Sequence, residues 1–265
     1  LPISIVIPCY NEALSLPYMR RTLRYIQEHL GHQYEVHVVL VDDCSNDGTG
    51  MLIDSYAAES PTWKAVHHDL NRGVAAAIQT GIRHAETEIV CSVDCDCSYD
   101  PLVLEQMIPA LTDDVDLVTA SPYHPAGAVE NVARWRLGLS KGLSRLYRLL
   151  LPAKLHTYTS CCRVYRRSLV AELELEHGGF LGVAELTGRL ALANRRIVEV
   201  PATLESRLFG ESKMKVARTI RGHLGLAWRF WKMGRRNSEC SQSVADEVTT
   251  KETKSPAEPS RSERG

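Results

Sequence analysis

The chain has 265 residues, of which 44% are hydrophobic and 24% are charged. This balance is typical of a globular protein and excludes wholesale disorder, collagen and coiled coil. Because 31 Lys and Arg residues nearly balance 32 Asp and Glu residues, the formal charge of -1 gives no bulk attraction for nucleic acid, and we expect no nucleic-acid partner.

The sequence contains no stretch of about 18 uncharged apolar residues, so it predicts no membrane-spanning helix. Leu1–Ile3 lacks the basic region that opens a signal peptide. Eight cysteines occur, several within apolar runs and none at zinc-finger spacing with His, which favours reduced thiols in a cytoplasmic protein. Cys95 and Cys97 could bind a soft metal, but two ligands at this spacing are a weak signal.

Apolar runs rich in β-branched residues alternate with helical patterns over the first 120 residues. The runs predict buried strands at Ile3–Ile7, Val36–Val41, Lys64–His68, Ile89–Val93 and Val115–Ala120. The intervening patterns predict helices at Glu12–Leu30, from Thr49 to about Ala58, at Gly73–Ala85 and from Pro101 onward. This alternation predicts an α/β fold with a mostly parallel central sheet and helices on both faces.

The pattern is less regular after Ser121. It predicts a loop at Ser121–Glu130, a helix at Asn131–Leu151, a strand at Cys162–Tyr165, a helix at Phe180–Ala193, a strand at Ile197–Val200 and a helix at Met214–Met233. From Asn237 the chain is polar with almost no large apolar residue, which predicts a disordered tail. We therefore divide the chain into a domain over 1–213, a basic amphipathic helix over 214–236 and a tail over 237–265.

Polar segments follow three of the predicted strands, at Pro8–Glu12, Asp42–Gly48 and Asp94–Ser98. Because the carboxyl ends of parallel strands lie along one edge of a sheet, we expect these segments to converge. Carboxylates beside an aromatic ring suit a divalent cation together with a ring-bearing ligand. Taken singly, Asp42 or Asp47 could simply form a turn or cap the next helix.

Asp94 and Asp96 stand two residues apart at the end of a strand. On an extended segment such residues point the same way, so both carboxylates can face one Mg²⁺ or Mn²⁺. A cation held there would neutralise charge on a departing diphosphate. The pair is therefore the predicted metal site.

Four motifs in order resemble family 2 glycosyltransferases, which have the GT-A fold, a Rossmann-like three-layer sandwich: Ser4–Glu12, Val41–Thr49, Asn71–Gly73 and Asp94–Asp96. Two later segments, Thr157–Arg166 and Arg207–Lys213, are similar to the dolichol and polyprenyl-phosphate mannosyltransferase branch. The likeness spans about Ile3 to Lys215. Pro122 is a departure, because it stands where that branch usually has an Arg.

The resemblance implies a role for each matching position. Residues that would hold the base and ribose of a sugar nucleotide are Pro8, Tyr10, Glu12, Val41 and Asp43. Asp94, Cys95 and Asp96 would lie at the ribose, the diphosphate and the metal, with Asp96 as the main metal ligand. Arg207 and Lys213 would grip phosphate groups, and with Asp96 they are the predicted catalytic residues; a solvated basic surface is the alternative for the two cations.

The motifs therefore predict an inverting, metal-dependent glycosyltransferase whose donor is GDP-mannose or a UDP-sugar and whose expected acceptor is a polyprenyl phosphate. Transfer to a non-lipid hydroxyl is the first alternative; it requires a general base, for which Glu185 or Asp100 would be candidates, with a surface carboxylate on a helix as the equal alternative for Glu185. A sugar-nucleotide-binding protein without turnover is the second. A dehydrogenase is disfavoured, because no glycine-rich phosphate turn follows the first strand.

Two basic segments bear on the acceptor. In Arg134–Leu151 leucines alternate with Arg and Lys, and residues 201–236 contain nine Lys or Arg, two Glu and the aromatic residues Trp228, Phe230 and Trp231. A basic helix with an apolar face can lie in a lipid headgroup layer. For the first segment, packing on the domain itself or on a partner is favoured over contact with lipid. For the second segment, the two interpretations are equally supported. We expect a cytoplasmic protein, with peripheral contact at the inner face of the membrane or with a membrane partner left open.

Overall fold

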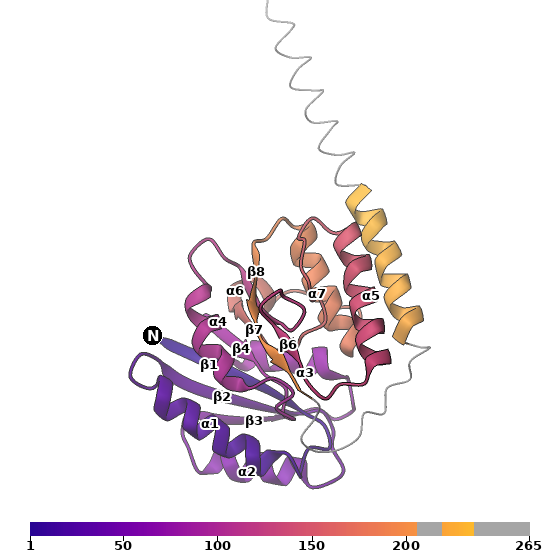
Figure 1. Ribbon diagram of the computed structural model, residues 1–265. Coiled ribbons are helices and arrows are strands. Elements are labelled where there is room, and N and C mark those ends of the chain that lie inside the picture. The colour runs from indigo at the N-terminus through magenta and orange to yellow at the C-terminus, as the bar shows by residue number, and fades with distance from the viewer. Residues whose placement is uncertain (206–218, 236–265) are drawn as a thin grey trace, which may run out of the picture.

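Seven strands form the central sheet of the computed structural model, which describes residues 1–205 and 219–235 (Figure 1). In chain order they are β1 (Pro2–Cys9), β2 (Glu35–Asp42), β3 (Trp63–His67), β4 (Ile89–Ser92), β5 (Leu117–Ser121), β7 (Arg163–Arg166) and β8 (Ile197–Pro201). Their order in the sheet is β3-β2-β1-β4-β7-β5-β8. The mostly parallel sheet is confirmed, and within it β7 runs antiparallel to both neighbours.

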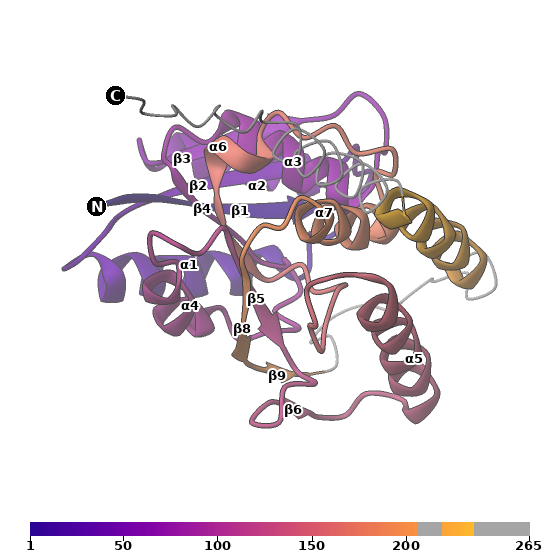
Figure 2. The same cartoon turned by 90° about the horizontal axis from the view of Figure 1, so that it is seen from above.

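Helices cover both faces of this sheet, which confirms the three-layer architecture (Figure 2). One face carries α1 (Leu16–Leu30), α2 (Thr49–Ala58) and α4 (Leu104–Ala110), the last preceded by the 3-10 turn η1 (Pro101–Val103). The other face carries α3 (Val74–His84), α6 (Arg167–Val170) and α7 (Phe180–Leu192). Outside these layers lie α5 (Arg134–Leu150), a helix over 219–235 and a small sheet of β6 (Ala128–Val129) with β9 (Thr203–Leu204).

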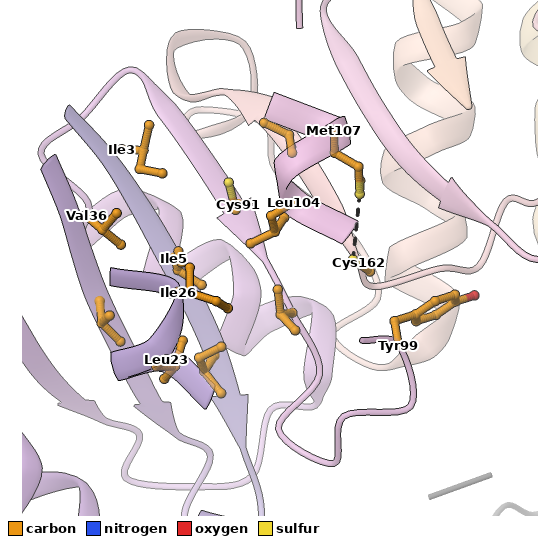
Figure 3. Close-up of a cluster of buried hydrophobic side chains, with 14 of the residues drawn as sticks. Ile3, Ile5, Leu23, Ile26, Val36, Cys91, Tyr99, Leu104, Met107 and Cys162 are labelled. Carbon is orange, nitrogen blue, oxygen red and sulfur yellow. Dashed lines mark hydrogen bonds between the residues drawn. The ribbon is translucent and has the colours of Figure 1, made fainter. Parts of the chain in front are cut away.

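Strand β1 lies inside the sheet and is apolar on both faces, because helices cover both sides of a parallel sheet. Ile3 and Ile5 pack toward Leu23 and Ile26 of α1 (Figure 3). Val6, which points the opposite way, belongs to the cluster that includes α3 and α7. Burying each such side chain stabilises the fold by about 1.5–3 kcal/mol. These contacts hold β1 rigidly, so the residues at its end have a fixed position.

The start of α1 differs from the prediction. The helix begins at Leu16 rather than Glu12, because the N–H groups of Ser15 and Leu16 donate to the Glu12 carbonyl in a turn and Pro17 occupies the first helical turn. Glu12 therefore belongs to the loop at the end of β1. The helix expected from Asn131 likewise begins at Arg134.

The strand order reverses next to β1. Strands β2 and β3 extend the sheet on one side of β1, and the chain then returns to place β4 on the other side. Ligands of open α/β sheets bind at the carboxyl ends of strands where the order reverses. The ends of β1 and β4 are therefore the place where the fold favours a site.

The helix over 219–235 packs on the domain through one face. Leu226, Ala227 and Phe230 are buried in a cluster with Tyr147 of α5 and residues of α7. Gly188 of α7 makes room for the aromatic ring, since a Cβ added there would lie 2.1 Å from Phe230 Cζ. Packing on its own domain is thus confirmed for this face, whereas the boundary at 213 and the tail from 237 fall outside the described residues.

No helix within 1–205 or 219–235 combines the length and the apolar character needed to cross a bilayer. The seven cysteines of these two segments are free thiols, as the sequence predicted.

Candidate active site

The ends of β1, β2 and β4 surround a cavity of about 290 Å³ at the carboxyl edge of the sheet. Seven of the residues proposed from sequence line it, namely Pro8, Tyr10, Glu12, Asp43, Asp94, Cys95 and Asp96. The three polar segments therefore converge as expected. This cavity is called the strand-end pocket below.

Three predicted site residues are not placed in the strand-end pocket. Val41 is fully buried in the core beside Val6 and Val39, and it is absent from the residues that line the pocket. Its side chain therefore has no surface to offer a nucleotide. Arg207 and Lys213 lie outside the described residues.

Asn11 joins the end of β1 to the turn after β2. Its φ of 55° is left-handed, a conformation that Asn tolerates better than most residues. The Asn11 N–H donates to Ser45 Oγ at 2.9 Å, and Asn11 Oδ1 accepts the Asn46 N–H at 2.9 Å. Glu12 follows, with its N–H donating to Thr49 Oγ1 at 2.9 Å. These bonds fix the backbone that carries Tyr10, whose ring remains 49% exposed at the pocket.

Asp42 and Asp47 shape the turn after β2 and do not line the pocket. Asp42 Oδ1 accepts the Ser45 N–H at 3.1 Å, and Asp47 Oδ1 accepts the N–H of Thr49 at 3.1 Å at the start of α2. Burial raises the pKa of Asp47, but hydrogen bonds from Thr49 and from the Ala13 N–H outweigh it and lower that pKa overall. The turn-and-cap interpretation is confirmed for these two carboxylates.

Asp43 organises one wall of the pocket. Its Oδ1 accepts the Arg72 N–H at 2.8 Å and lies 2.7 Å from His68 Nδ1, and its Oδ2 accepts the Gly73 N–H at 2.7 Å. Gly73 has a φ of +92° and a Cβ there would lie 2.7 Å from the Gly178 carbonyl oxygen, so glycine is required. The motif at 71–73 is thus a loop held by a buried carboxylate.

Asp94 and Asp96 both line the pocket after β4, but the extended backbone predicted for them is wrong: the Cys97 N–H donates to the Asp94 carbonyl at 3.2 Å, so Asp96 lies in a turn. Asp96 is only 5% exposed, and its Oδ1 accepts the N–H and the hydroxyl of Ser98 at 3.0 and 2.6 Å. Asp94 forms a hydrogen bond with the Cys161 thiol. Across 1–205 and 219–235, no group of three or more His, Cys, Asp or Glu residues could hold a metal. Asp94 and Asp96 therefore bring two carboxylates to the pocket, a set that suits Mg²⁺ or Mn²⁺ when ligand phosphates and water complete the coordination.

Sequence reasoning missed the far wall of the pocket, formed by Gly179 and Phe180 at the start of α7. Both follow Gly178, whose Cβ would lie 1.9 Å from the Arg72 carbonyl oxygen. The loop before α7 therefore approaches the 71–73 segment as closely as backbone allows. The pair of adjacent glycines was the available signal, because such pairs mark close backbone approach.

The two candidates for a general base do not reach the strand-end pocket. Glu185 is buried, and its carboxylate accepts the N–H groups of Glu176 and His177 and the Arg189 Nε–H at 2.8–3.1 Å. Burial raises the pKa of Glu185, but hydrogen bonds with the His177 ring, the Glu176 N–H and the Arg189 guanidinium outweigh it and lower that pKa. Glu185 is thus not a surface carboxylate; it is absent from the residues that line the strand-end pocket, and it anchors the loop before α7. Asp100 caps η1 by accepting the Leu102 N–H at 3.0 Å.

The family model for glycosyl transferase family 2 matches residues 4–174 of the chain. Over 218 residues the chain is 33% identical to the polyprenol monophosphomannose synthase of Mycolicibacterium smegmatis, and the alignment covers 79% of this chain and 80% of that protein. It is 34% identical over 215 residues to the undecaprenyl-phosphate mannosyltransferase of Micrococcus luteus, covering 79% and 86%. The chain therefore belongs to glycosyl transferase family 2, as its motifs indicated.

The fold is also found in solved structures. Glucosyl-3-phosphoglycerate synthase from Mycobacterium tuberculosis, solved with Mn²⁺, uridine diphosphate and glucosyl-3-phosphoglycerate, superposes with a TM-score of 0.60 at 16% identity. The match covers 85% of this chain and 77% of that one. This likeness confirms the GT-A fold.

Proposed function

We propose that this glycosyltransferase moves a mannosyl group from a nucleoside-diphosphate sugar to a polyprenyl phosphate, with inversion at the anomeric carbon. The observation that carries the proposal is the convergence of Tyr10, Glu12, Asp94 and Asp96 on one pocket at the strand ends. The two relatives, named as a mannose synthase and a mannosyltransferase of polyprenyl lipids, support the sugar and the acceptor.

Each residue at the pocket has a role that its chemistry permits. The half-exposed Tyr10 ring can stack on a base, and Glu12 can accept hydrogen bonds from ribose hydroxyls. A divalent cation, Mg²⁺ or Mn²⁺, held at Asp94 and Asp96 would supply the positive charge that stabilises the leaving diphosphate. Asp43 acts indirectly, by holding the 71–73 wall in place. From the resemblance we assign phosphate contacts to Arg207 and Lys213.

A second cavity, of about 170 Å³, offers the acceptor an approach. It shares Asp94, Asp96 and Phe180 with the strand-end pocket and continues past Thr157 to Ser140 and Tyr123. A phosphate monoester is largely ionised near pH 7, so it can attack without a general base. Holding donor and acceptor in line then becomes the main contribution of the protein. That Glu185 and Asp100 lie away from the pocket favours this acceptor over a hydroxyl.

The direct test is a donor panel of GDP- and UDP-sugars with Mn²⁺, incubated with and without polyprenyl phosphate and followed by product analysis. We expect a mannosyl phospholipid of inverted anomeric configuration, formed from one nucleotide sugar only when the lipid phosphate is present. Transfer to a hydroxyl compound, or tight donor binding without any product, would contradict the proposal.

We also propose that the outer face of the helix over 219–235 contacts a membrane carrying anionic lipid. Leu224, Trp228 and Trp231 follow at intervals of four and three residues and are 45–55% exposed, on a side of the helix next to its buried face. Lys232 Nζ lies 3.7 Å from the Trp228 ring centroid, and the Arg235 guanidinium lies 5.1 Å from that of Trp231. Aromatic rings flanked by cations suit the headgroup region of such a bilayer.

Vesicle sedimentation tests this contact. The variant Trp228→Ala/Trp231→Ala should bind vesicles containing phosphatidylglycerol at least about tenfold more weakly than the wild type, since each ring carries much of the buried apolar area. Met51→Ala, which removes an exposed side chain of α2, is the matched control and should bind as the wild type does. Equal binding of the double variant and the wild type would contradict a membrane role for this face.

A further inference from the structure

The loop before α7 ends at the far wall of the strand-end pocket. Its last residue, Gly179, lines the pocket together with Phe180, the first residue of α7. Phe180 also lines the second cavity, so its position affects the shape of both cavities. We call residues 176–180 the wall segment.

Backbone contacts hold the wall segment against the opposite wall of the pocket. The Gly178 carbonyl accepts the Ala76 N–H at 2.9 Å, and a Cβ on Gly178 would lie 1.9 Å from the Arg72 carbonyl oxygen. A Cβ on Gly182 would lie 1.9 Å from the His177 carbonyl oxygen. The segment therefore has no room to move toward α3 or toward the first turn of α7.

Glu185 holds the start of the wall segment from inside the domain. Its side chain is 1% exposed, and its carboxylate accepts the N–H groups of Glu176 and His177 at 3.1 Å. Glu185 Oε2 lies 2.8 Å from His177 Nδ1, and Oε1 accepts the Arg189 Nε–H at 2.8 Å. Hydrogen bonds to a charged group are stronger than neutral ones. Glu185 thus fixes two consecutive backbone N–H groups directly before the pocket wall.

The helix over 219–235 lies beside α7, and its Arg229 holds the same segment from outside (Figure 2). The guanidinium forms an ion pair with Glu176, and its Nη2 lies 3.3 and 3.4 Å from the two ring nitrogens of His177. Arg189 also pairs with Glu176, at 3.2 Å, and with the buried glutamate of α7. An isolated surface ion pair contributes little to stability, whereas charges that form a network contribute more.

We propose that Glu185 and Arg229 are positioning residues for the strand-end pocket, so that the helix over 219–235 contributes to nucleotide binding without touching the nucleotide. Neither residue lines the pocket, so both act through the position of Gly179 and Phe180. The helix takes part because one arginine connects it to the wall segment. The inference rests on the nucleotide binding proposed above, and it depends neither on the choice of acceptor nor on membrane contact.

Hydrogen exchange of the full chain without nucleotide tests the anchoring itself. In Glu185→Gln an amide replaces the carboxylate that accepts two N–H groups, so the amides of 176–180 should exchange at least about tenfold faster than in the wild type. Arg229→Gln should speed the same amides about threefold. Arg221→Gln, which removes an exposed arginine of the same helix, should match the wild type. Wild-type exchange in both Glu185→Gln and Arg229→Gln would overturn the proposal.

Calorimetric titration of GDP and UDP with Mn²⁺ measures the effect on the pocket. The dissociation constant should rise about tenfold in Glu185→Gln and about three- to fivefold in Arg229→Gln. Arg229→Lys keeps a cation beside Glu176, so its dissociation constant should lie between those of Arg229→Gln and the wild type. Arg221→Gln should bind as the wild type does. Wild-type affinity in both Glu185→Gln and Arg229→Gln would overturn the proposal.

The variant Phe180→Ala separates positioning from a general loss of structure. If Glu185 and Arg229 act through the wall, either substitution should weaken binding by less than about twofold once Phe180 is truncated. The same loss of affinity with and without Phe180 would overturn the proposal. A wild type that binds neither GDP nor UDP would overturn the nucleotide function as well, whereas a wild type that binds, with variants that bind equally, would overturn this inference alone.

Discussion

Asp43 Oδ2 accepts the backbone N–H of Gly73 at 2.7 Å, so a carboxylate at the end of β2 positions a pocket wall that lies 30 residues further along the chain. In Asp43→Asn an amide group would face the N–H donors of Arg72 and Gly73 and leave at least one unsatisfied. We expect the free energy of unfolding to fall by about 2–3 kcal/mol and nucleoside-diphosphate affinity to fall at least about tenfold.

Urea unfolding and calorimetric titration of the nucleotide measure these two effects. Asp54→Asn is the matched control, because it makes the same change at an exposed carboxylate that contacts His67 and lies away from the pocket. It should change the free energy of unfolding by less than about 0.5 kcal/mol. Unchanged affinity in a folded Asp43→Asn variant would show that the 71–73 wall does not contribute to nucleotide binding.

Gly188 and Phe230 make a second prediction possible. Because a Cβ at 188 would lie 2.1 Å from Phe230 Cζ, Gly188→Ala should displace the ring and cost about 1–3 kcal/mol of unfolding free energy. Gly225→Ala, in the helix over 219–235, meets no atom within 4 Å and should be neutral or stabilise by up to about 1 kcal/mol. Thermal or urea unfolding compares the two, and equal effects would contradict tight docking of this helix.

His223 gives the stability a pH dependence. Burial, with a smaller contribution from the nearby charge of His177, lowers the pKa of His223 from 6.5 to about 4, and its Nδ1 lies 2.7 Å from Tyr147 Oη. Between these two pH values the unfolded chain binds a proton that the folded chain does not. The free energy of unfolding should therefore fall as pH drops from about 6.5 to 4, by up to about 3 kcal/mol.

The His223→Gln variant isolates that contribution. Its unfolding free energy should decline less than that of the wild type between pH 6.5 and 4, whereas His32→Gln, which changes an exposed histidine, should follow the wild type. Urea unfolding at several pH values measures both curves. Parallel curves for His223→Gln and the wild type would mean that His223 titrates normally in the folded protein.

Most of the fold could be predicted from sequence because buried parallel strands are apolar throughout and are easily recognised. The direction of β7 could not be, since Arg163–Arg166 is short and its antiparallel pairing with β4 and β5 depends on tertiary structure alone. The burial of Arg163 could not be predicted either, because it also depends on tertiary structure. Its guanidinium lies within the core and donates to the Tyr158 and Val183 carbonyls.

The candidate site was predictable where it follows strands, because strand ends of a parallel sheet meet at one edge. Tyr10, Asp43 and Asp96 reach the pocket for that reason. Phe180 was missed because it approaches from a helix 84 residues after Asp96, and the glycine pair before it indicates a close backbone approach without showing which segment is approached. Glu185 was misjudged because burial and hydrogen bonding, rather than residue type, decide what a carboxylate does.

Metal-dependent nucleotide binding at Asp96 tests the central assignment most directly. Calorimetric titration of GDP and UDP, with Mn²⁺ or with EDTA, should show that chelation weakens binding to the wild type and to Asp54→Asn at least about tenfold. In a folded Asp96→Asn variant, binding should be weak and the same in both conditions. The account would be contradicted if Asp96→Asn kept the affinity and the Mn²⁺ dependence of the wild type.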